Sequence, residues 1–116
     1  MTDTIFKLID RPAWRAASEA GTFGGSAVDA GDGFIHFSTA AQLPETAARH
    51  FAGRSDLVLV AVDAAVLGDA LRWEVSRGGA LFPHLYGPLS MGAVRWVAEL
   101  TLDAAGRHVF PDLDRA

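Results

Sequence analysis

Cysteine is absent from this chain of 116 residues, and that absence removes several classes of protein at once. Without cysteine there is no disulfide framework, no thiolate metal site and no cysteine nucleophile. Basic residues are also few, since ten Lys and Arg stand against fourteen Asp and Glu. The resulting net charge of −4 argues against a general nucleic-acid-binding surface.

Long apolar runs are missing as well. No segment approaches the roughly 20 apolar residues that cross a bilayer, and the first residues lack the basic and apolar regions of a signal peptide. We therefore expect a cytoplasmic protein that does not bind membranes. Half of the residues are apolar, which is enough to build a core. The length fits one domain over residues 1–116, with its core over about residues 5–110.

Hydrophobic patterning predicts an α+β protein with a strongly bent, mainly antiparallel sheet and two short helices. The run 56–63 is almost continuously apolar, which is typical of a strand buried on both faces in the middle of a sheet. Residues 22–33 contain four glycines and are expected to form a long loop. The other expected strands cover residues 5–9, 33–39, 71–75, 94–102 and 108–110, and the helices cover 12–20 and 45–52.

Residues 33–39 form an apolar stretch with polar side chains on one face. Strand geometry places Phe34, His36 and Ser38 on one side and Ile35 and Phe37 on the other. His36 is either a core histidine bonded to a backbone carbonyl or a pocket residue that orients a ligand. It lies roughly 7 Å from Ser38 at ~3.3 Å per residue, too far for a direct catalytic dyad. A serine hydrolase is therefore not expected.

A second polar stretch, residues 73–87, follows later in the chain, and we expect the two stretches to line one pocket. Glu74 is the general-base candidate if its strand face lines that pocket. Otherwise it is a solvated carboxylate paired with Arg72 of its own face or with a neighbouring strand. Arg77 is a candidate anion contact, because the glycine pair after it lets the backbone approach a ligand.

Pro83 predicts that residues 82–87 are extended and irregular rather than a central strand. Irregular segments often carry binding residues, which makes His84 a candidate. Tyr86 is either a stacking residue for a flat ligand or a core side chain. The four histidines of the chain show no HxH or HxxxH spacing, so no metal site is expected.

Several motifs together resemble a known family. Residues 32–39, Asp-Gly-Phe-Ile-His-Phe-Ser-Thr, followed by Gln42, and residues 82–87, Phe-Pro-His-Leu-Tyr-Gly, are similar to the small bacterial family called domain of unknown function 952. Trp73-Glu74 belongs to the same pattern, and the similarity runs from residue 5 to about residue 102. The resemblance implies a fold like that of the ADP-ribosyltransferases, in which a bent sheet surrounds a cleft that holds NAD.

A more distant likeness concerns the RNA 2′-phosphotransferases. Residues 35–38, Ile-His-Phe-Ser, resemble the His-Leu-Ser strand of that family. The chain departs from its pattern because Asp32 stands before Gly33 where that family has basic residues. The Glu-x-Glu motif of arginine-specific ADP-ribosyltransferases is also missing, since Val75 and Ser76 follow Glu74.

These resemblances imply the fold and a nucleotide cleft. Together with the residue types in the two polar stretches, they lead us to expect a NAD- or nucleotide-dependent transferase with NAD as the candidate cofactor. His36 and Glu74 are then the catalytic candidates. The ligand-binding candidates are Ser38, Thr39, Arg77, His84 and Tyr86. Two alternatives stay open: a non-catalytic module that binds a nucleotide or another small molecule, and a protein-interaction domain with a degenerate cleft. The substrate and the oligomeric state stay open too.

Overall fold

The structure is a computed structural model that describes residues 4–113, without the side chain of Arg77. The strands in this range are β1 (Thr4–Asp10), β2 (Thr22–Phe23), β3 (Ile35–His36), β4 (Leu57–Asp63), β5 (Leu71–Val75), β6 (Leu81–Leu85), β7 (Leu89–Ser90), β8 (Val94–Leu102) and β9 (His108–Val109). The α-helices are α1 (Arg11–Ala20), α2 (Ala27–Asp32), α3 (Leu43–His50) and α4 (Ala64–Leu67). Short 3-10 helices occupy Gly68–Ala70, Arg77–Gly79 and Met91–Ala93.

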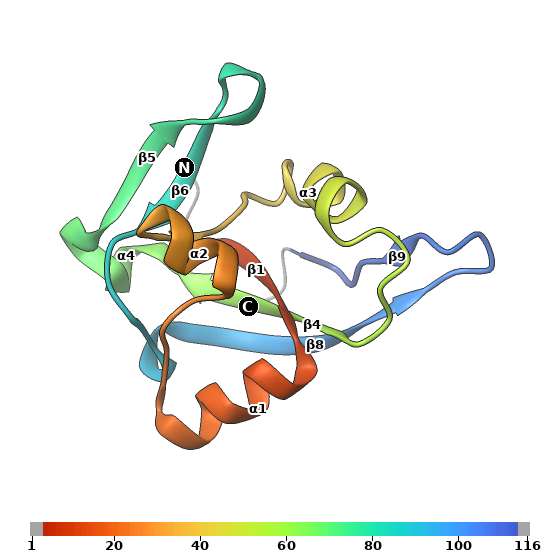
Figure 1. Ribbon diagram of the computed structural model, residues 1–116, viewed down its shortest axis with the longest axis horizontal. Coiled ribbons are helices and arrows are strands. Elements are labelled where there is room, and N and C mark those ends of the chain that lie inside the picture. The colour runs from red at the N-terminus through yellow and green to blue at the C-terminus, as the bar shows by residue number, and fades with distance from the viewer. Residues whose placement is uncertain (1–3, 114–116) are drawn as a thin grey trace.

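The strands of this α+β fold pair in antiparallel fashion and form three sheets, in the orders β1-β4-β8-β9, β3-β6-β5 and β2-β7. Figure 1 shows the long, curved strands of the first sheet crossing the molecule and the β5–β6 hairpin projecting away from it. The first two sheets are joined where Phe6 of β1 pairs with Ser38 through two backbone hydrogen bonds of 2.8 and 2.9 Å. Residues 37–38 therefore carry the chain from one sheet to the other.

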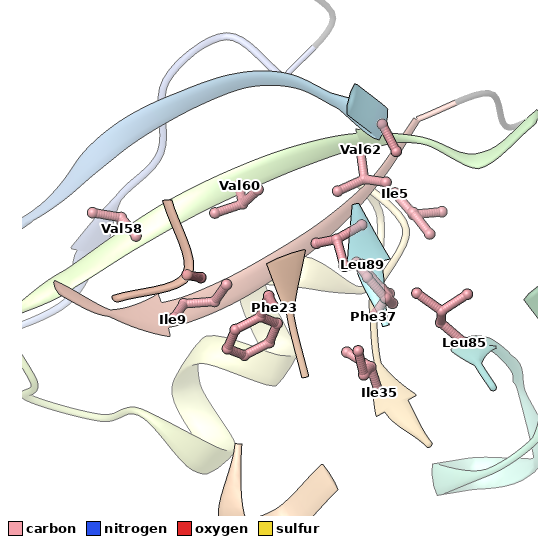
Figure 2. Close-up of a cluster of buried hydrophobic side chains, with 12 residues drawn as sticks. Ile5, Ile9, Phe23, Ile35, Phe37, Val58, Val60, Val62, Leu85 and Leu89 are labelled. Atoms are coloured by element: carbon pink, nitrogen blue, oxygen red, sulfur yellow. The ribbon is translucent and has the colours of Figure 1, made fainter. Parts of the chain in front are cut away.

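The strand β4 lies between β1 and β8, as its continuous apolar sequence predicts. Alternate side chains of β4 enter two different cores, because successive residues of a strand point to opposite faces. On one face, Val58, Val60 and Val62 pack with Phe23, Ile35, Leu85 and other residues of the smaller sheets, as Figure 2 shows. On the other face, Leu57, Leu59 and Ala61 pack with Phe6, Leu43 and Trp96.

The prediction that residues 82–87 lack regular structure is wrong. Residues 81–85 form β6, the central strand of the sheet β3-β6-β5. Pro83 lies opposite Trp73 of β5, and its carbonyl accepts from Phe37 N at 3.0 Å on the other side. Because the N–H and C=O of one strand residue point to the same side, the missing N–H of Pro83 faces Phe37, just beyond the end of β3. The proline therefore costs one ladder bond at a strand end rather than in mid-sheet.

The expected loop over residues 22–33 also has more structure than predicted, because it contains α2 in addition to the two predicted helices. The remaining helix of the described chain, α4, is a single turn, as residues 64–68 predict. Phe23 belongs to β2 and is buried, and α2 occupies the second half of the segment. Ser26 and Asp29 cap α2 reciprocally, and Gly33 ends it with a left-handed φ of 86°. A side-chain cap at one end and a glycine at the other suffice for a helix of this length.

The ends of α1 agree with the sequence prediction. Asp10 accepts a hydrogen bond from Ala13 N at 3.1 Å, and Gly21 ends the helix with a φ of 84°. None of the helices among residues 4–113 is long and apolar enough to cross a membrane.

Candidate functional site

The two polar stretches meet in the sheet β3-β6-β5. His36 of β3 lies opposite His84 of β6, and Arg72 of β5 lies opposite His84 on the other side. Glu74 is opposite Phe82, two residues further along the same pair of strands. Pairing of distant segments therefore gathers these side chains on one face of the smaller sheet.

Phe34 joins the two imidazoles. Its ring stacks on that of His84 with centroids 4.1 Å apart and planes at 27°. It also contacts the rings of His36 at 4.5 Å and of Tyr86 at 5.3 Å. The His36 and His84 rings themselves meet edge to face, with centroids 5.5 Å apart. Packing against one phenyl ring thus limits the rotation of all three neighbours.

Two aspartates of α2 contact the two nitrogens of the His36 ring. Its Nδ1 lies 2.6 Å from Asp29 Oδ1, and its Nε2 lies 2.9 Å from Asp32 Oδ2. The side chain of Asp29 is buried, whereas that of Asp32 is half exposed to solvent. A doubly protonated ring donates to both carboxylates, whereas a neutral ring donates to only one. Asp29 is therefore a fixed orienting partner and Asp32 a displaceable one.

Lys7 completes this cluster from β1. Its Nζ lies 3.2 Å from Asp29 Oδ2 and donates to the backbone carbonyl of His36 at 2.8 Å. Asp29 also accepts from the backbone N–H groups of Ser26 at 2.8 Å and of His36 at 3.1 Å. This buried carboxylate thus ties together β1, α2 and β3.

These contacts change the pKa values of both charged groups. Burial alone would raise the pKa of Asp29, but the hydrogen bond from His36 and the charge of Lys7 outweigh it and hold the pKa well below its ordinary value. Burial lowers the pKa of Lys7, and the nearby Asp29 opposes that change. Asp29 is therefore an ionised acceptor for His36 across the physiological pH range.

The second imidazole has its own carboxylate. His84 Nδ1 lies 2.8 Å from Glu74 Oε1, and the Tyr86 hydroxyl donates to the same oxygen at 2.7 Å. The hydrogen bonds from His84 and then Tyr86 lower the pKa of Glu74, while the bond to Glu74 raises the pKa of Tyr86. The Arg72 guanidinium lies 5.1 Å from the centre of the Tyr86 ring. Glu74 is therefore paired with the neighbouring strand β6 and with Tyr86 just after it.

A cavity of about 1010 Å³ opens between the two sheets. It is large enough for a small molecule, since ligand pockets commonly measure roughly 300 to 1,000 Å³. Its polar lining, from both sheets and from α2 and α3, is Lys7, Asp10, Ser26, Asp29, Asp32, His36, Ser38, Thr46, His50, Arg54, Ser76 and His84. Glu74 and Tyr86 are not part of this lining and lie behind His84.

The remaining candidates are placed differently. Ser38 is buried at the cavity wall, where its Oγ lies 2.9 Å from Thr46 Oγ1. Thr39 does not line the cavity. Its backbone N–H donates to Gln42 Oε1, and its hydroxyl accepts from Gln42 N, in the turn before α3. The backbone of Arg77 belongs to the 3-10 turn Arg77–Gly79, and its side chain lies outside the described part of the chain.

Among residues 4–113, no group of three or more His, Asp and Glu side chains is arranged to hold a metal ion. The described part of the chain therefore offers side chains for hydrogen bonding, stacking and proton transfer, and no cluster of metal ligands.

Sequence reasoning missed Lys7, Asp29 and the role of Phe34. Two signals were present. Ser26 and Asp29 have the spacing of a capping box, which predicts a helix start inside the glycine-rich segment. Lys7 interrupts an apolar strand on the face that carries Ile5 and Ile9, so it requires a buried anionic partner.

The model of the family DUF952, described as a protein of unknown function, matches residues 8–97. The chain belongs to this family. None of the curated proteins compared with this DUF952 chain matches it significantly. The match includes Asp29, His36 and His84, and Lys7 of the same cluster lies one residue before it.

Solved structures of CC0527 from Caulobacter crescentus are similar to this DUF952 chain. The X-ray structure is 53% identical with a TM-score of 0.88, covering 91% of this chain and 93% of that one. The solution NMR structure is 54% identical with a TM-score of 0.82, covering 90% of each chain. These proteins therefore share the fold along most of their length.

Proposed function

We propose that this DUF952 protein binds a nucleotide of the NAD type in the cavity between its sheets and transfers the ADP-ribosyl group. One observation carries the proposal: the His36 ring, fixed by buried Asp29, stands at the wall of a cavity large enough for a small ligand. An imidazole held by a carboxylate is a suitable proton acceptor or donor near neutral pH. The resemblance to ADP-ribosyltransferases supports the choice of NAD.

In this reaction the bond between ribose C1′ and nicotinamide breaks, and nicotinamide leaves as a neutral molecule with the electron pair. An acceptor hydroxyl attacks C1′, and its proton passes to Nε2 of the neutral His36 ring after the ligand displaces Asp32. The displaced Asp32 carboxylate faces the developing ribosyl cation. Ser38 and Thr46 supply hydroxyls to orient the ligand, and Arg54 supplies a cation for the diphosphate.

Glu74 acts as a positioning residue in this scheme. It holds His84 Nδ1 at 2.8 Å and lies behind that ring instead of lining the cavity. His84 in turn packs against Phe34, which contacts His36. Loss of Glu74 is therefore expected to weaken ligand orientation, whereas loss of His36 removes the proton acceptor.

A second candidate function is binding without catalysis. It is favoured by one observation: Asp29, Asp32 and Glu74 are all engaged by imidazole nitrogens at 2.9 Å or less. Carboxylates that are already hydrogen-bonded to histidine rings are not available for catalysis. Such a site can still recognise a ligand through its aromatic rings and hydroxyl groups. This reading predicts stoichiometric binding of a nucleotide with no release of nicotinamide.

The test is the release of nicotinamide from NAD by the purified protein, measured by chromatography. The proposal predicts release that His36→Ala abolishes and Ser18→Ala leaves unchanged, since Ser18 lies on α1 outside the cavity lining. Saturable binding without release would assign the binding function instead. Absence of both binding and release would overturn both functions.

A further inference from the structure

Within residues 4–113, no strand pairs with the outer edge of β5. Pro83 directs its carbonyl toward Phe37 of the β3 segment, so its β5 neighbour Trp73 does not share backbone hydrogen bonds with it. Since backbone direction alternates along a strand, Trp73 and Val75 point their N–H and C=O groups away from β6. Leu71 also points away from β6, but its N–H donates to Gly68 O, so only its carbonyl is offered to the edge. Figure 1 shows β5 on the outer side of the projecting hairpin. This edge is therefore open to another strand.

One face of the same hairpin is apolar and exposed toward its tip. Trp73 is 39% exposed, Val75 70% and Leu81 52%. The face begins at the core, where Leu71 and Leu85 pack, and continues outward without a polar residue until the turn. These side chains keep a large exposed area in the monomer, and an added strand would cover part of it.

The β5 sequence, Leu-Arg-Trp-Glu-Val, is complementary to itself in antiparallel pairing about its centre. Trp73 then faces Trp73 of a second copy, and Leu71 faces Val75. Arg72 faces Glu74 in both halves, so opposite charges meet across the new strand pair. These two residues occupy the non-hydrogen-bonded positions, where facing side chains are closest.

We propose that this protein forms a two-fold symmetric dimer in which the β5 edges of two copies pair in antiparallel register centred on Trp73. The pairing joins the two three-stranded sheets into one sheet of six strands and removes both open edges. It is an isologous contact, so it closes at two copies. The axis is perpendicular to the sheet, so both sites lie on the same face, and Arg72 of each copy approaches Glu74 of the other. This proposal does not depend on the ligand.

Sedimentation equilibrium of Val75→Pro beside Val75→Thr tests the edge pairing. Proline removes an N–H that points to the open edge, and it leaves the hydrogen bonds between β5 and β6 intact, while threonine keeps that N–H. The expected result is a dimer for the wild type and Val75→Thr, and a monomer for Val75→Pro with unchanged circular dichroism. A wild type that stays monomeric at high concentration, or a folded Val75→Pro variant that dimerises equally well, would overturn the proposal.

Single cysteines test the register, because the chain has none of its own. Across the two-fold axis, the Cα atoms at position 73 would lie about 5.5 Å apart, which suits a disulfide. The two positions 75 would lie roughly 13 Å apart, at ~3.3 Å per residue over four residues. Trp73→Cys is therefore expected to give disulfide-linked dimers under mild oxidation, and Val75→Cys is not. Equal cross-linking of both variants, or none at position 73, would contradict the register.

Discussion

Asp29 is the residue on which the candidate site depends most. It is buried, and it accepts from Lys7, the His36 ring and two backbone N–H groups on three segments of the chain. The buried lysine needs this carboxylate to offset its loss of hydration. One side chain thus couples the stability of the fold to the orientation of the imidazole.

Asp29→Asn is expected to destabilise the fold by about 3–5 kcal/mol, because it leaves the Lys7 charge buried without a counter-charge. The matched control is Asp32→Asn, which removes the other carboxylate of His36 at a half-exposed position and is expected to cost less than about 1 kcal/mol. Urea unfolding measures both. Equal losses in the two variants would contradict the central role of Asp29.

The depressed pKa of Asp29 also predicts acid sensitivity. In the unfolded chain an aspartate titrates near ~3.9, whereas in the folded chain the pKa of Asp29 is lower, so the unfolded state binds protons first as the pH falls. The stabilisation is complete above about pH 5 and is lost progressively as the pH falls below about 4. Glu74, whose pKa is also lowered, acts in the same direction.

Urea unfolding at a series of pH values checks this dependence. The free energy of unfolding of the wild type is expected to decrease toward low pH, and that of Asp29→Asn is expected to decrease less steeply. An equally steep decrease in both proteins would show that other groups cause the acid sensitivity.

At the scale of elements, α2 is a six-residue helix that delivers both aspartates to His36. A helix this short has little stability of its own, so its caps matter more than its propensity. The Ser26 hydroxyl accepts from Asp29 N at 3.3 Å, while Asp29 accepts from Ser26 N. The capping box therefore fixes the same side chain that orients the imidazole.

Ser26→Ala is expected to destabilise the protein by about 1 kcal/mol, the usual cost of a lost N-cap. The variant is also expected to increase the rate of amide hydrogen exchange more in α2 than in β4. Ser18→Ala on α1 is the control, since that hydroxyl donates to Trp14 O on an exposed helix face and caps no helix. Unchanged exchange in α2 would show that the helix does not depend on its cap.

The elements differ in how far the sequence predicts them. Continuous apolar residues predict β4, Asp10 and Gly21 predict the ends of α1, and residues 94–102 match β8. The strand β6 could not be predicted, because a central strand accommodates Pro83 only where its missing N–H faces the end of the neighbouring strand. Where β3 ends is not visible in the sequence. The helix α2 was obscured by glycines, although its capping pattern is visible in the sequence.

The candidate site divides in the same way. Alternation along residues 34–38 correctly separates Ile35 and Phe37, which enter the core, from Phe34 and His36. The sequence does not predict that Glu74 pairs with His84. Alternation along a strand separates its two faces, but it does not say which face packs against other residues. The partnership of Asp29 with Lys7 spans 22 residues of chain and needs the folded arrangement to become visible.

For the whole molecule, the cavity exists because two sheets diverge from the junction between Phe6 and Ser38. One wall comes from β1 of the larger sheet and the other from β3 and β6 of the smaller one. His36 and His84 lie on the smaller sheet, and Lys7 reaches from the larger sheet to the His36 carbonyl. A ligand in the cavity would contact both sheets and stabilise their relative position.

Calorimetric titration of the purified protein with NAD, ADP-ribose and nicotinamide, beside His36→Ala and Ser18→Ala, tests the central claim most directly. We predict saturable binding of NAD or ADP-ribose, unchanged in Ser18→Ala and at least about tenfold weaker in His36→Ala, the loss expected when a hydrogen bond worth about 1.5 kcal/mol is removed. The account is contradicted if no ligand gives heat at about millimolar concentration. A dissociation constant of about 1 mM corresponds to a binding free energy of only about −4 kcal/mol. It is contradicted equally if His36→Ala binds as tightly as the wild type.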